Sequence, residues 1–397
     1  MLNYNSEDIV ALATPPGLAA LAVIRLSGES LAATYKSFAH KAPRDRVATY
    51  SKIYHPKTNA ILDEAIITFF KSPSSFTGED VIEISCHGGN FVSNSIIMAA
   101  IEGGARAADP GEFSLRAFLN GKIDLLQAEA ISSLISSKAD LSAKISLQHL
   151  DGCISRSIQE IKSSAIDLLS VIENELDFSE NEIDIMSYKE LSGKIFKIKK
   201  MIEKILNASV FGKNIFSGFR VILFGKTNSG KSSLFNTILG VDRAIVSSSP
   251  GTTRDTVEAW IELSGVPVCL VDTAGIWESD EYLDKIGVKK TFSELERADL
   301  CIIVDENDPA LMLSDNFSKD FIEKCVLVKS KCDHLNQKFD EDNIIFISSK
   351  NGIGIERLLT YISTFIINNV GDLGDTGLVL ITERQRGLLE FSLASLD

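Results

Sequence analysis

Residues 225–232, near the middle of the chain, constrain its fold more than any other stretch. They match G-x-x-x-x-G-K-[ST], a glycine-rich loop whose backbone N–H groups surround phosphate oxygens. The apolar run 220–224 before the loop predicts a buried strand, and residues 233–239 after it predict a helix. Strand, loop and helix together predict a nucleotide site at the positive end of the helix dipole. Lys231 can reach the outer phosphates and the Ser232 hydroxyl can bind Mg²⁺. The alternative is a glycine turn that merely joins a strand to a helix.

Length and composition predict a globular protein with two or three domains. The chain has 397 residues, of which 45% are hydrophobic and 24% charged. We find no apolar stretch of the ~18 residues that a membrane span requires, and the N-terminus lacks the basic start of a signal peptide. The six cysteines are scattered without a C-x-x-C pair, which predicts buried free thiols. We therefore expect a cytoplasmic protein without membrane contact.

The formal net charge of −14 limits how the chain can contact nucleic acid. Because an acidic surface repels RNA, any RNA contact must use a local basic patch or the surface of a partner. One lysine-rich stretch spans residues 189–213. We interpret it as a solvated helix face.

The chain changes pattern several times along its length. Residues 1–118 predict a mixed α/β domain with strands at 21–26, 65–70 and 81–86. Apolar residues spaced by 3 and 4 then predict two amphipathic helices, 154–176 and 191–205, that pack as an antiparallel bundle. Continuous apolar runs after the phosphate loop predict a mainly parallel sheet covered on both faces, with strands at 266–271, 300–304, 325–328 and 344–347. From about Leu378 the pattern becomes helical again.

Two motifs downstream of the phosphate loop suit the γ-phosphate and its metal ion. Asp272 ends a predicted strand, where it can hold Mg²⁺ through water, and the Gly275 amide can sense the γ-phosphate. Residues 251–255, Gly-Thr-Thr-Arg-Asp, occupy the position of a mobile switch loop. The Thr253 hydroxyl can complete the magnesium shell, although a polar turn is the alternative interpretation.

Two further motifs at strand ends suit a guanine base. The carboxylate of Asp333 can accept hydrogen bonds from the N–H groups on the Watson–Crick edge of guanine, a donor pair that adenine lacks. Lys331 can lie along the plane of the base. Residues 348–350, Ser-Ser-Lys, can offer backbone amides to guanine O6. Together these motifs predict selectivity for GTP.

These five motifs, in this order, resemble those of the Ras-like GTPases. Residues 251–255 and 272–276 narrow the resemblance to the bacterial branch that contains Era, Der and MnmE. Segments outside this region resemble the MnmE (TrmE) family, GTPases of tRNA wobble-uridine modification; these segments are residues 9–17, 76–83, 87–89 and 110–124.

The family resemblance implies a multidomain α/β fold. It has an N-terminal mixed α/β folate-binding-like domain, a central α-helical bundle and an inserted Ras-like P-loop GTPase domain with a mainly parallel sheet. The predicted bounds are 1–118 for the N-terminal folate-binding and dimerisation domain, 119–213 for the first part of the helical domain, 214–372 for the GTPase domain and 373–397 for the return to the helical domain.

The resemblance also implies ligands and partners. A formyl-tetrahydrofolate is expected at Arg25, Glu83 and Lys122, because two cations and one carboxylate suit a glutamate-tailed pterin. Hydrolysis is expected to need K⁺, held by Asn228 and by Ser247, Ser249 and Thr252. The implied partners are a second copy of the chain, bound through the N-terminal domain, the flavoprotein MnmG, in a heterotetramer, and tRNA. The implied reaction installs an aminomethyl or carboxymethylaminomethyl group at the wobble uridine.

The full predicted site follows from the motifs and the resemblance. The predicted GTP-binding residues are Asn228, Ser229, Gly230, Lys231, Ser232, Ser233, Ser247, Ser248, Ser249, Pro250, Gly251, Thr252, Thr253, Asp272, Thr273, Ala274, Gly275, Ser330, Lys331, Cys332, Asp333, Ser348, Ser349 and Lys350. The predicted catalytic residues are Asp284, Lys231 and Thr253, and the predicted Mg²⁺ ligands are Ser232 and Thr253.

The sequence departs from the family pattern at three places. Ser330 replaces an asparagine, which predicts the loss of one hydrogen bond to the base or the phosphate loop and guanine binding weaker by about 1–2 kcal/mol. Asp284 replaces the glutamate that orients the attacking water, and its shorter reach predicts slow turnover. The family's Cys-x-Gly-Lys tail is not found, which predicts an uncovered apolar face on the helical bundle, whether the chain is truncated or has lost the tail.

Two other functional classes stay open at this point. An Era- or Der-like ribosome-assembly switch should carry an RNA-binding module or a second GTPase domain, and we find neither in the sequence. A degenerate protein that binds folate and guanine nucleotide without catalysis is compatible with Ser330, Asp284 and the tail. Potassium-stimulated GTP hydrolysis distinguishes this last class from a modification enzyme.

Overall fold

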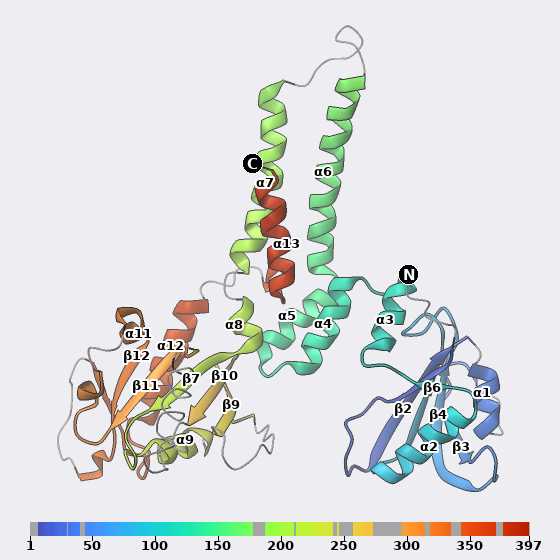
Figure 1. Ribbon diagram of the computed structural model, residues 1–397, viewed down its shortest axis with the longest axis horizontal. Coiled ribbons are helices and arrows are strands. Elements are labelled where there is room, and N and C mark those ends of the chain that lie inside the picture. The colour runs from blue at the N-terminus through green and yellow to red at the C-terminus, as the bar shows by residue number, and fades with distance from the viewer. Residues whose placement is uncertain are drawn as a thin grey trace, which may run out of the picture. The chain divides into compact units, whose positions relative to one another are not determined.

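The computed structural model describes two compact units of the chain, Met1–Ala128 and Glu129–Asp397 (Figure 1). The described residues are 7–29, 31–39, 44–177, 187–209, 212–240, 244–245, 257–272, 295, 297–313, 318–334, 343–370 and 376–396. The four-part division predicted from the sequence is finer than these two units and stays a prediction.

The first unit is a six-stranded sheet covered by helices. The strands occur in the order β3-β4-β5-β2-β1-β6, and neighbours run antiparallel except β1 and β6. Their bounds are β1 (Ile9–Leu12), β2 (Leu21–Gly28), β3 (Thr49–Tyr54), β4 (Ile61–Phe70), β5 (Asp80–His87) and β6 (Arg106–Ala107). The helices are α1 (Leu31–Phe38), α2 (Asn90–Glu102) and α3 (Glu112–Leu119). The predicted strands 21–26, 65–70 and 81–86 are confirmed within β2, β4 and β5.

The core of the first unit lies between this sheet and the helices α1 and α2. Ile24 and Leu26 of β2 and Ile84 of β5 are fully buried there. Tyr35 and Phe38 of α1 pack against the same cluster, with their rings edge to face. The alternation of apolar and polar residues along β5 thus corresponds to one face in the core and one face outside it.

The second unit begins with helices and contains the predicted bundle. The helices are α4 (Leu125–Ser136), which spans the division between the units, α5 (Asp140–Leu150), α6 (Cys153–Asp177), α7 (Tyr188–Ala208), α8 (Gly212–Ser217) and α13 (Glu383–Ala394). The two predicted amphipathic helices are confirmed as α6 and α7. Figure 1 shows them side by side, and Leu168, Ile198 and Ile202 are buried between them, with leucines of α13 packed on this cluster.

The last helix begins later than the sequence pattern indicates. We expected a helix from about Leu378, but α13 starts at Glu383, after an N-cap at Thr382 whose capping box includes Gln385. Residues 376–378 form a single 3₁₀ turn, and Val379 and Leu380 are buried without joining a helix. The expectation was wrong because this apolar run is buried in the core before the helix begins.

Part of the apolar surface of the bundle is uncovered among the described residues, as expected. Leu169 and Leu176 of α6 and Leu388 and Phe391 of α13 are all more than half exposed. No helix among the described residues is both long and apolar enough to cross a membrane. All six cysteines are free thiols, as predicted, and four of them are buried.

The rest of the second unit is a seven-stranded, mainly parallel sheet with helices on it, as predicted. The strands occur in the order β13-β12-β11-β7-β10-β9-β8, and only β9 and β8 run antiparallel to their neighbours. The bounds are β7 (Phe219–Phe224), β8 (Ala244–Ile245), β9 (Val257–Leu263), β10 (Val266–Asp272), β11 (Leu300–Asp305), β12 (Cys325–Lys329) and β13 (Ile344–Phe346). The helices are α9 (Lys231–Gly240), α11 (Lys319–Glu323) and α12 (Ile355–Val370).

Helix α5 joins the helical part of this unit to the sheet. Ile145 belongs to the same buried cluster as the strand residues, and the amide of Leu141 donates to the carbonyl of Gly265 at 3.0 Å. The side chain of His149, on the same helix, is completely buried beside the segment that precedes α13. Neither of its ring nitrogens makes a well-formed hydrogen bond with the described residues.

We predict that His149 makes the second unit sensitive to mild acid. Burial lowers its pKa from 6.5 to about 4, and the nearby carbonyls of Val379 and Gly377 oppose only part of this shift. Between those two pH values the unfolded chain binds a proton that the folded chain does not, so stability is full above pH 6.5 and falls as pH decreases. The loss from pH 7 to pH 5 should be about 2 kcal/mol.

The measurement is urea unfolding followed by tryptophan fluorescence, because both tryptophans, Trp260 and Trp277, belong to the second unit. The variant His149→Leu should lose about 2 kcal/mol less than the wild type between pH 7 and pH 5. Parallel pH profiles for the two proteins would contradict the prediction.

Candidate functional site

The phosphate loop connects β7 to α9, as the sequence predicts. Gly225 begins the loop, and a Cβ at this position would lie 2.1 Å from the carbonyl oxygen of Val304 on β11, so only glycine fits. Asn228 has a left-handed backbone with φ of 59°, a conformation that asparagine tolerates better than most residues. The loop is therefore shaped by close contact with the neighbouring strand.

Lys231 places a buried cation in the centre of this loop. Its side chain is only 3% exposed, and Nζ donates to the carbonyls of Gly225 at 2.8 Å and Lys226 at 2.6 Å. Burial lowers the pKa of Lys231, and the nearby carboxylate of Asp272 partly opposes this effect. An anionic phosphate would interact strongly with a cation held in so little water.

Ser330 connects the end of β12 to the phosphate loop. Its hydroxyl donates to the carbonyl of Ser229 at 2.6 Å, and both residues are buried. A hydrogen bond to the phosphate loop is therefore kept, although serine is shorter than the asparagine of the family pattern. The hydrogen bond that we predicted to be lost can therefore only be one to the guanine base.

Asp333 lies where the ends of β12 and β13 meet. Its carboxylate accepts a hydrogen bond from the buried hydroxyl of Ser348, whose oxygen in turn accepts from the amide of Asn351 at 3.2 Å. These contacts orient one carboxylate oxygen. Lys331 forms an ion pair with Glu306 at 2.6 Å, and the carbonyl of Ser349 accepts from Thr237 of α9 at 3.3 Å.

Two carboxylates lie at the ends of β10 and β11, the two strands that pair with β7 on either side. The buried residue Asp272 ends β10, opposite Leu223 of β7. Its counterpart Asp305, which was not predicted from the sequence, ends β11 and accepts from the amides of Asn307 at 2.8 Å and Asp308 at 3.1 Å. The signal was available, because Asp305 directly follows an apolar run just as Asp272 does.

The described part of the predicted site thus comes from four strand ends and one helix. The exposed hydroxyls of Ser232 and Ser233 lie at the start of α9, and Cys332 is buried beside Asp333. The predicted residues that lie outside the described part of the chain are Ser247, Ser248, Ser249, Pro250, Gly251, Thr252, Thr253, Thr273, Ala274, Gly275 and Asp284.

The predicted folate residues lie around one loop of the first unit. Arg25 of β2 is directly opposite Glu83 of β5, and its guanidinium donates to Glu83 Oε1 at 2.7 and 3.0 Å. The same guanidinium lies over the rings of Phe76 and Phe113, 5.5 and 5.8 Å from their centroids. Lys122 donates to the carbonyl of Pro73 at 3.0 Å. The loop between β4 and β5 therefore contacts both cations.

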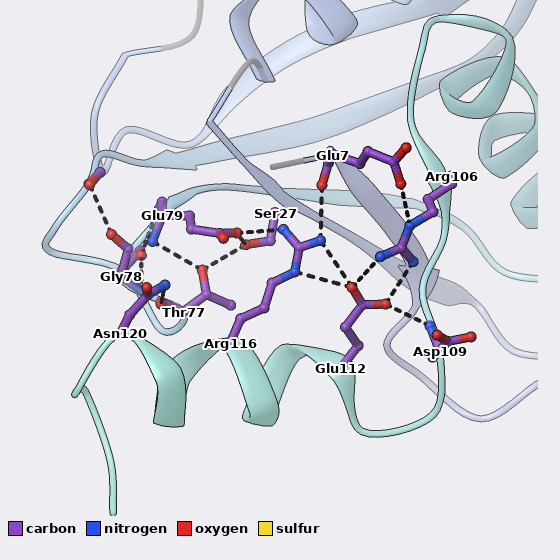
Figure 2. Close-up of polar contacts among 12 residues, drawn as sticks. Glu7, Ser27, Thr77, Gly78, Glu79, Arg106, Asp109, Glu112, Arg116 and Asn120 are labelled. Carbon is purple, nitrogen blue, oxygen red and sulfur yellow. Dashed lines mark hydrogen bonds and ion pairs between the residues drawn. The ribbon is translucent and has the colours of Figure 1, made fainter. Parts of the chain in front are cut away.

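A buried ion network holds this loop against α3 (Figure 2). Glu112, only 1% exposed, accepts from Arg106 at 2.6 and 2.8 Å and from Arg116 at 3.0 and 3.2 Å. Arg116 also donates to Glu79 at 2.9 Å, and Glu79 accepts from Ser27 at 2.8 Å. Hydrogen bonds from Arg106 are the largest cause that lowers the pKa of Glu112 to about 2.

This network was not predicted from the sequence, although Glu79, Glu112 and Arg116 belong to segments that carry the family resemblance. Glu112 and Arg116 are four residues apart, the spacing that places side chains together on a helix. The residues that join α3 to the rest of the unit, such as Glu79 and Ser27, are distant in sequence. Only the fold reveals those pairings.

Two protein-family models together match nearly the whole chain. A family model described as "MnmE helical domain" matches residues 125–397, and one described as "GTP-binding protein TrmE N-terminus" matches residues 8–122. The first of these covers more than half of the chain. The chain belongs to the MnmE family. The family resemblance inferred from the motifs is thereby confirmed.

Relatives named "tRNA modification GTPase MnmE" match the chain over most of its length. The protein of Acetivibrio thermocellus is 36% identical, over 99% of this chain and 89% of its own. The protein of Latilactobacillus sakei is 36% identical, over 98% and 87%, and that of Francisella tularensis strain SCHU S4 is 37% identical, over 93% and 83%. Among solved structures, Era in complex with MgGDPNP and a segment of 16S ribosomal RNA matches 37% of this chain and 56% of its own at 25% identity. Its TM-score of 0.30 is too low to bear on the assignment.

We predict that Ser330 contributes to nucleotide affinity through the phosphate loop. Ser330→Ala leaves the buried carbonyl of Ser229 without its donor and should weaken GDP binding by about 1–2 kcal/mol, roughly 5- to 30-fold. Ser330→Asn should bind GDP more tightly than wild type, because its amide can also reach the base. Fluorescence titration with a labelled GDP measures both, and Thr360→Ala on the exposed side of α12 is the control. Equal affinities for wild type and Ser330→Asn would contradict the second part.

Proposed function

We propose that this MnmE-family chain hydrolyses GTP as part of a tRNA-modification enzyme. The observation that carries the proposal is the pairing of two features at one edge of a sheet. A buried lysine sits in a glycine-rich phosphate loop, and a carboxylate suited to guanine lies at the end of a strand in the same sheet. The chain's membership of a family of tRNA modification GTPases supports the reaction class.

In this mechanism the described residues bind and orient the nucleotide. Lys231 exchanges its contacts with loop carbonyls for oxygens of the β- and γ-phosphates. Asp333, oriented by Ser348, accepts from the two N–H groups of guanine, and Ser330 keeps the phosphate loop next to the base-binding end of β12. We propose that Asp284 orients the attacking water and that Thr253 completes the magnesium shell.

The residues present suit two cations. The hydroxyl of Ser232 and the carboxylate of Asp272 are hard oxygen donors of the kind that Mg²⁺ prefers. Asn228 lies inside the phosphate loop, with a left-handed backbone at φ of 59°, and its side-chain amide has an oxygen that can bind a cation. Together with Ser247, Ser249 and Thr252 we propose it as a K⁺ ligand. The potassium charge would stabilise the negative charge that develops between the β- and γ-phosphates.

The first unit suits a folate. The Arg25–Glu83 pair is about one-third exposed and is flanked by the rings of Phe76 and Phe113. A flat pterin can stack on such rings, and its glutamate tail suits Lys122. We propose that this unit holds a tetrahydrofolate such as 5-formyltetrahydrofolate, which supplies the one-carbon unit, and that it forms a homodimer.

We further propose the partner and the product. An MnmG-like flavoprotein would complete the enzyme as a heterotetramer. The product would carry an aminomethyl or carboxymethylaminomethyl group at the wobble uridine of certain tRNAs. This part of the proposal extends what the family names say of the relatives to this chain.

The test is GTP hydrolysis by the purified chain in KCl and in NaCl of equal ionic strength. We expect hydrolysis in K⁺ to be faster by about tenfold or more, because a fixed cation stabilises the transition state. Two variants of Asn228 serve as controls. Asn228→Gly removes the side-chain amide without strain, because glycine tolerates a φ of 59°, and Asn228→Asp keeps a side-chain oxygen. Asn228→Gly should lose the stimulation, whereas Asn228→Asp should retain part of it.

Two outcomes would contradict the proposal. Equal rates of GTP hydrolysis in K⁺ and Na⁺ would show that the chain does not use the proposed potassium site. Tight GTP binding without turnover in either salt would indicate a binding protein that has lost catalysis.

A further inference from the structure

The exposed face of helix α7 carries a lysine stripe, which we define as Lys189, Lys197, Lys200 and Lys204. All four lysines are exposed, and their spacing of 8, 3 and 4 residues places them on one side of the helix. The opposite side buries Ile198, Ile202 and Ile205. The stripe extends about 22 Å along the helix axis, at 1.5 Å per residue.

The concentration of positive charge is unusual for this chain. The chain has 54 acidic and 40 basic residues, whereas α7 carries six lysines and only two acidic residues, Glu190 and Glu203. Lys197 and Lys200, and Lys200 and Lys204, are like-charge neighbours at i+3 and i+4. Each such pair destabilises a helix by about 0.2–0.5 kcal/mol. A helix face that only contacts solvent would avoid this cost by mixing acidic and basic residues. The lysine stripe therefore suits an anionic partner.

One aromatic ring interrupts the lysine stripe on its exposed face. Phe196 is 57% exposed, and Nζ of Lys200 lies over its ring, 4.7 Å from the centroid. Residue 193, one turn earlier, is a glycine, and a Cβ there would meet nothing within 4 Å. The ring therefore lies on open surface, where a flat group could stack on it. Lysines beside an exposed ring match the combination that binds nucleic acid, in which cations contact phosphates and an aromatic ring contacts a base.

We propose that the exposed face of α7 binds the phosphate backbone of the tRNA substrate, with Phe196 stacking on an unpaired base. The inference rests on the proposed function, because it assigns a surface to the tRNA on which that function acts. The acidic remainder of the chain repels RNA and so directs it to this face. An acidic protein partner would also be attracted by the lysines, but it would have no base to stack on Phe196.

The experiment measures binding of a fluorescent, unmodified tRNA transcript with uridine at the wobble position to the full chain. Fluorescence anisotropy is recorded from 50 to 300 mM potassium acetate. One variant changes all four lysines of the stripe to glutamine. The matched control changes four exposed lysines elsewhere to glutamine, namely Lys36, Lys71, Lys319 and Lys324, so that both variants have the same net charge. A third variant is Phe196→Ala.

We expect the stripe variant to bind at least tenfold more weakly at 100 mM salt. The slope of log K against log salt should become shallower by about 3, since each lost phosphate contact removes about 0.7–0.9. The control should stay within about twofold of wild type. Phe196→Ala should weaken binding about 5- to 30-fold, as expected for the loss of one stacked base, with the salt slope unchanged. Potassium-stimulated GTP hydrolysis without tRNA should be the same in all four proteins.

Several results would overturn the inference. If wild type binds tRNA and the stripe variant binds it equally well, the lysine stripe is not the tRNA-binding surface, while the proposed function stands. Equal losses in the stripe variant and the control would show an effect of net charge alone. If the stripe variant keeps tRNA binding but no longer co-purifies with the flavoprotein partner, the stripe is a protein-binding surface. If wild type itself does not bind tRNA at 50 mM salt, both the inference and the tRNA part of the proposed function fail.

Discussion

The second unit depends on the burial of strand β7 on both of its faces. Val221 and Leu223 point into one apolar cluster and Ile222 and Phe224 into another, so the strand lies at the centre of the sheet with helices on each side. A strand in this position has its carboxyl end fixed by neighbours on both sides. The phosphate loop begins at that end, and the close contact between Gly225 and Val304 fixes its first turn. The buried ammonium of Lys231 is held in place by the same arrangement.

The same geometry brings the other polar groups of the site together. Parallel strands end at one edge, so Asp272, Asp305 and Ser330 lie near the loop although they are far apart in sequence. The hydrogen bond from Ser330 to Ser229 connects the carboxyl end of β12, where we propose that the base binds, to the phosphate loop. In the first unit a buried ion network has the equivalent role, because Glu112 and Arg116 fix α3 and the loop next to the Arg25–Glu83 pair. In both units, a polar site is positioned by contacts between residues that are distant in sequence.

The distance in sequence between contacting residues explains which features could and could not be predicted from the sequence. Buried strands such as β7 and β11 are continuous apolar runs, and the two long helices have clear 3.6-residue periodicity, so both were predicted. Strand β9 was missed because it is only partly buried and carries Glu258 and Glu262. The start of α13 was misplaced because a short apolar run such as 378–380 has the same composition in a helix as in a buried segment outside one. Motif residues were found because their signal is local, whereas the Ser330–Ser229 bond and the Glu112 network depend on the fold.

We propose that the edge of the seven-stranded sheet selects guanine nucleotide through Asp333. The most direct measurement compares the affinities of wild type and Asp333→Asn for GDP and xanthosine diphosphate. Xanthine has a carbonyl where guanine has its exocyclic amino group, so an asparagine amide at this position can donate to it. We predict that Asp333→Asn loses GDP affinity by about 100-fold or more, as expected for a charge-assisted pair of hydrogen bonds, and prefers xanthosine diphosphate. If the variant still prefers GDP with near wild-type affinity, Asp333 does not select the base.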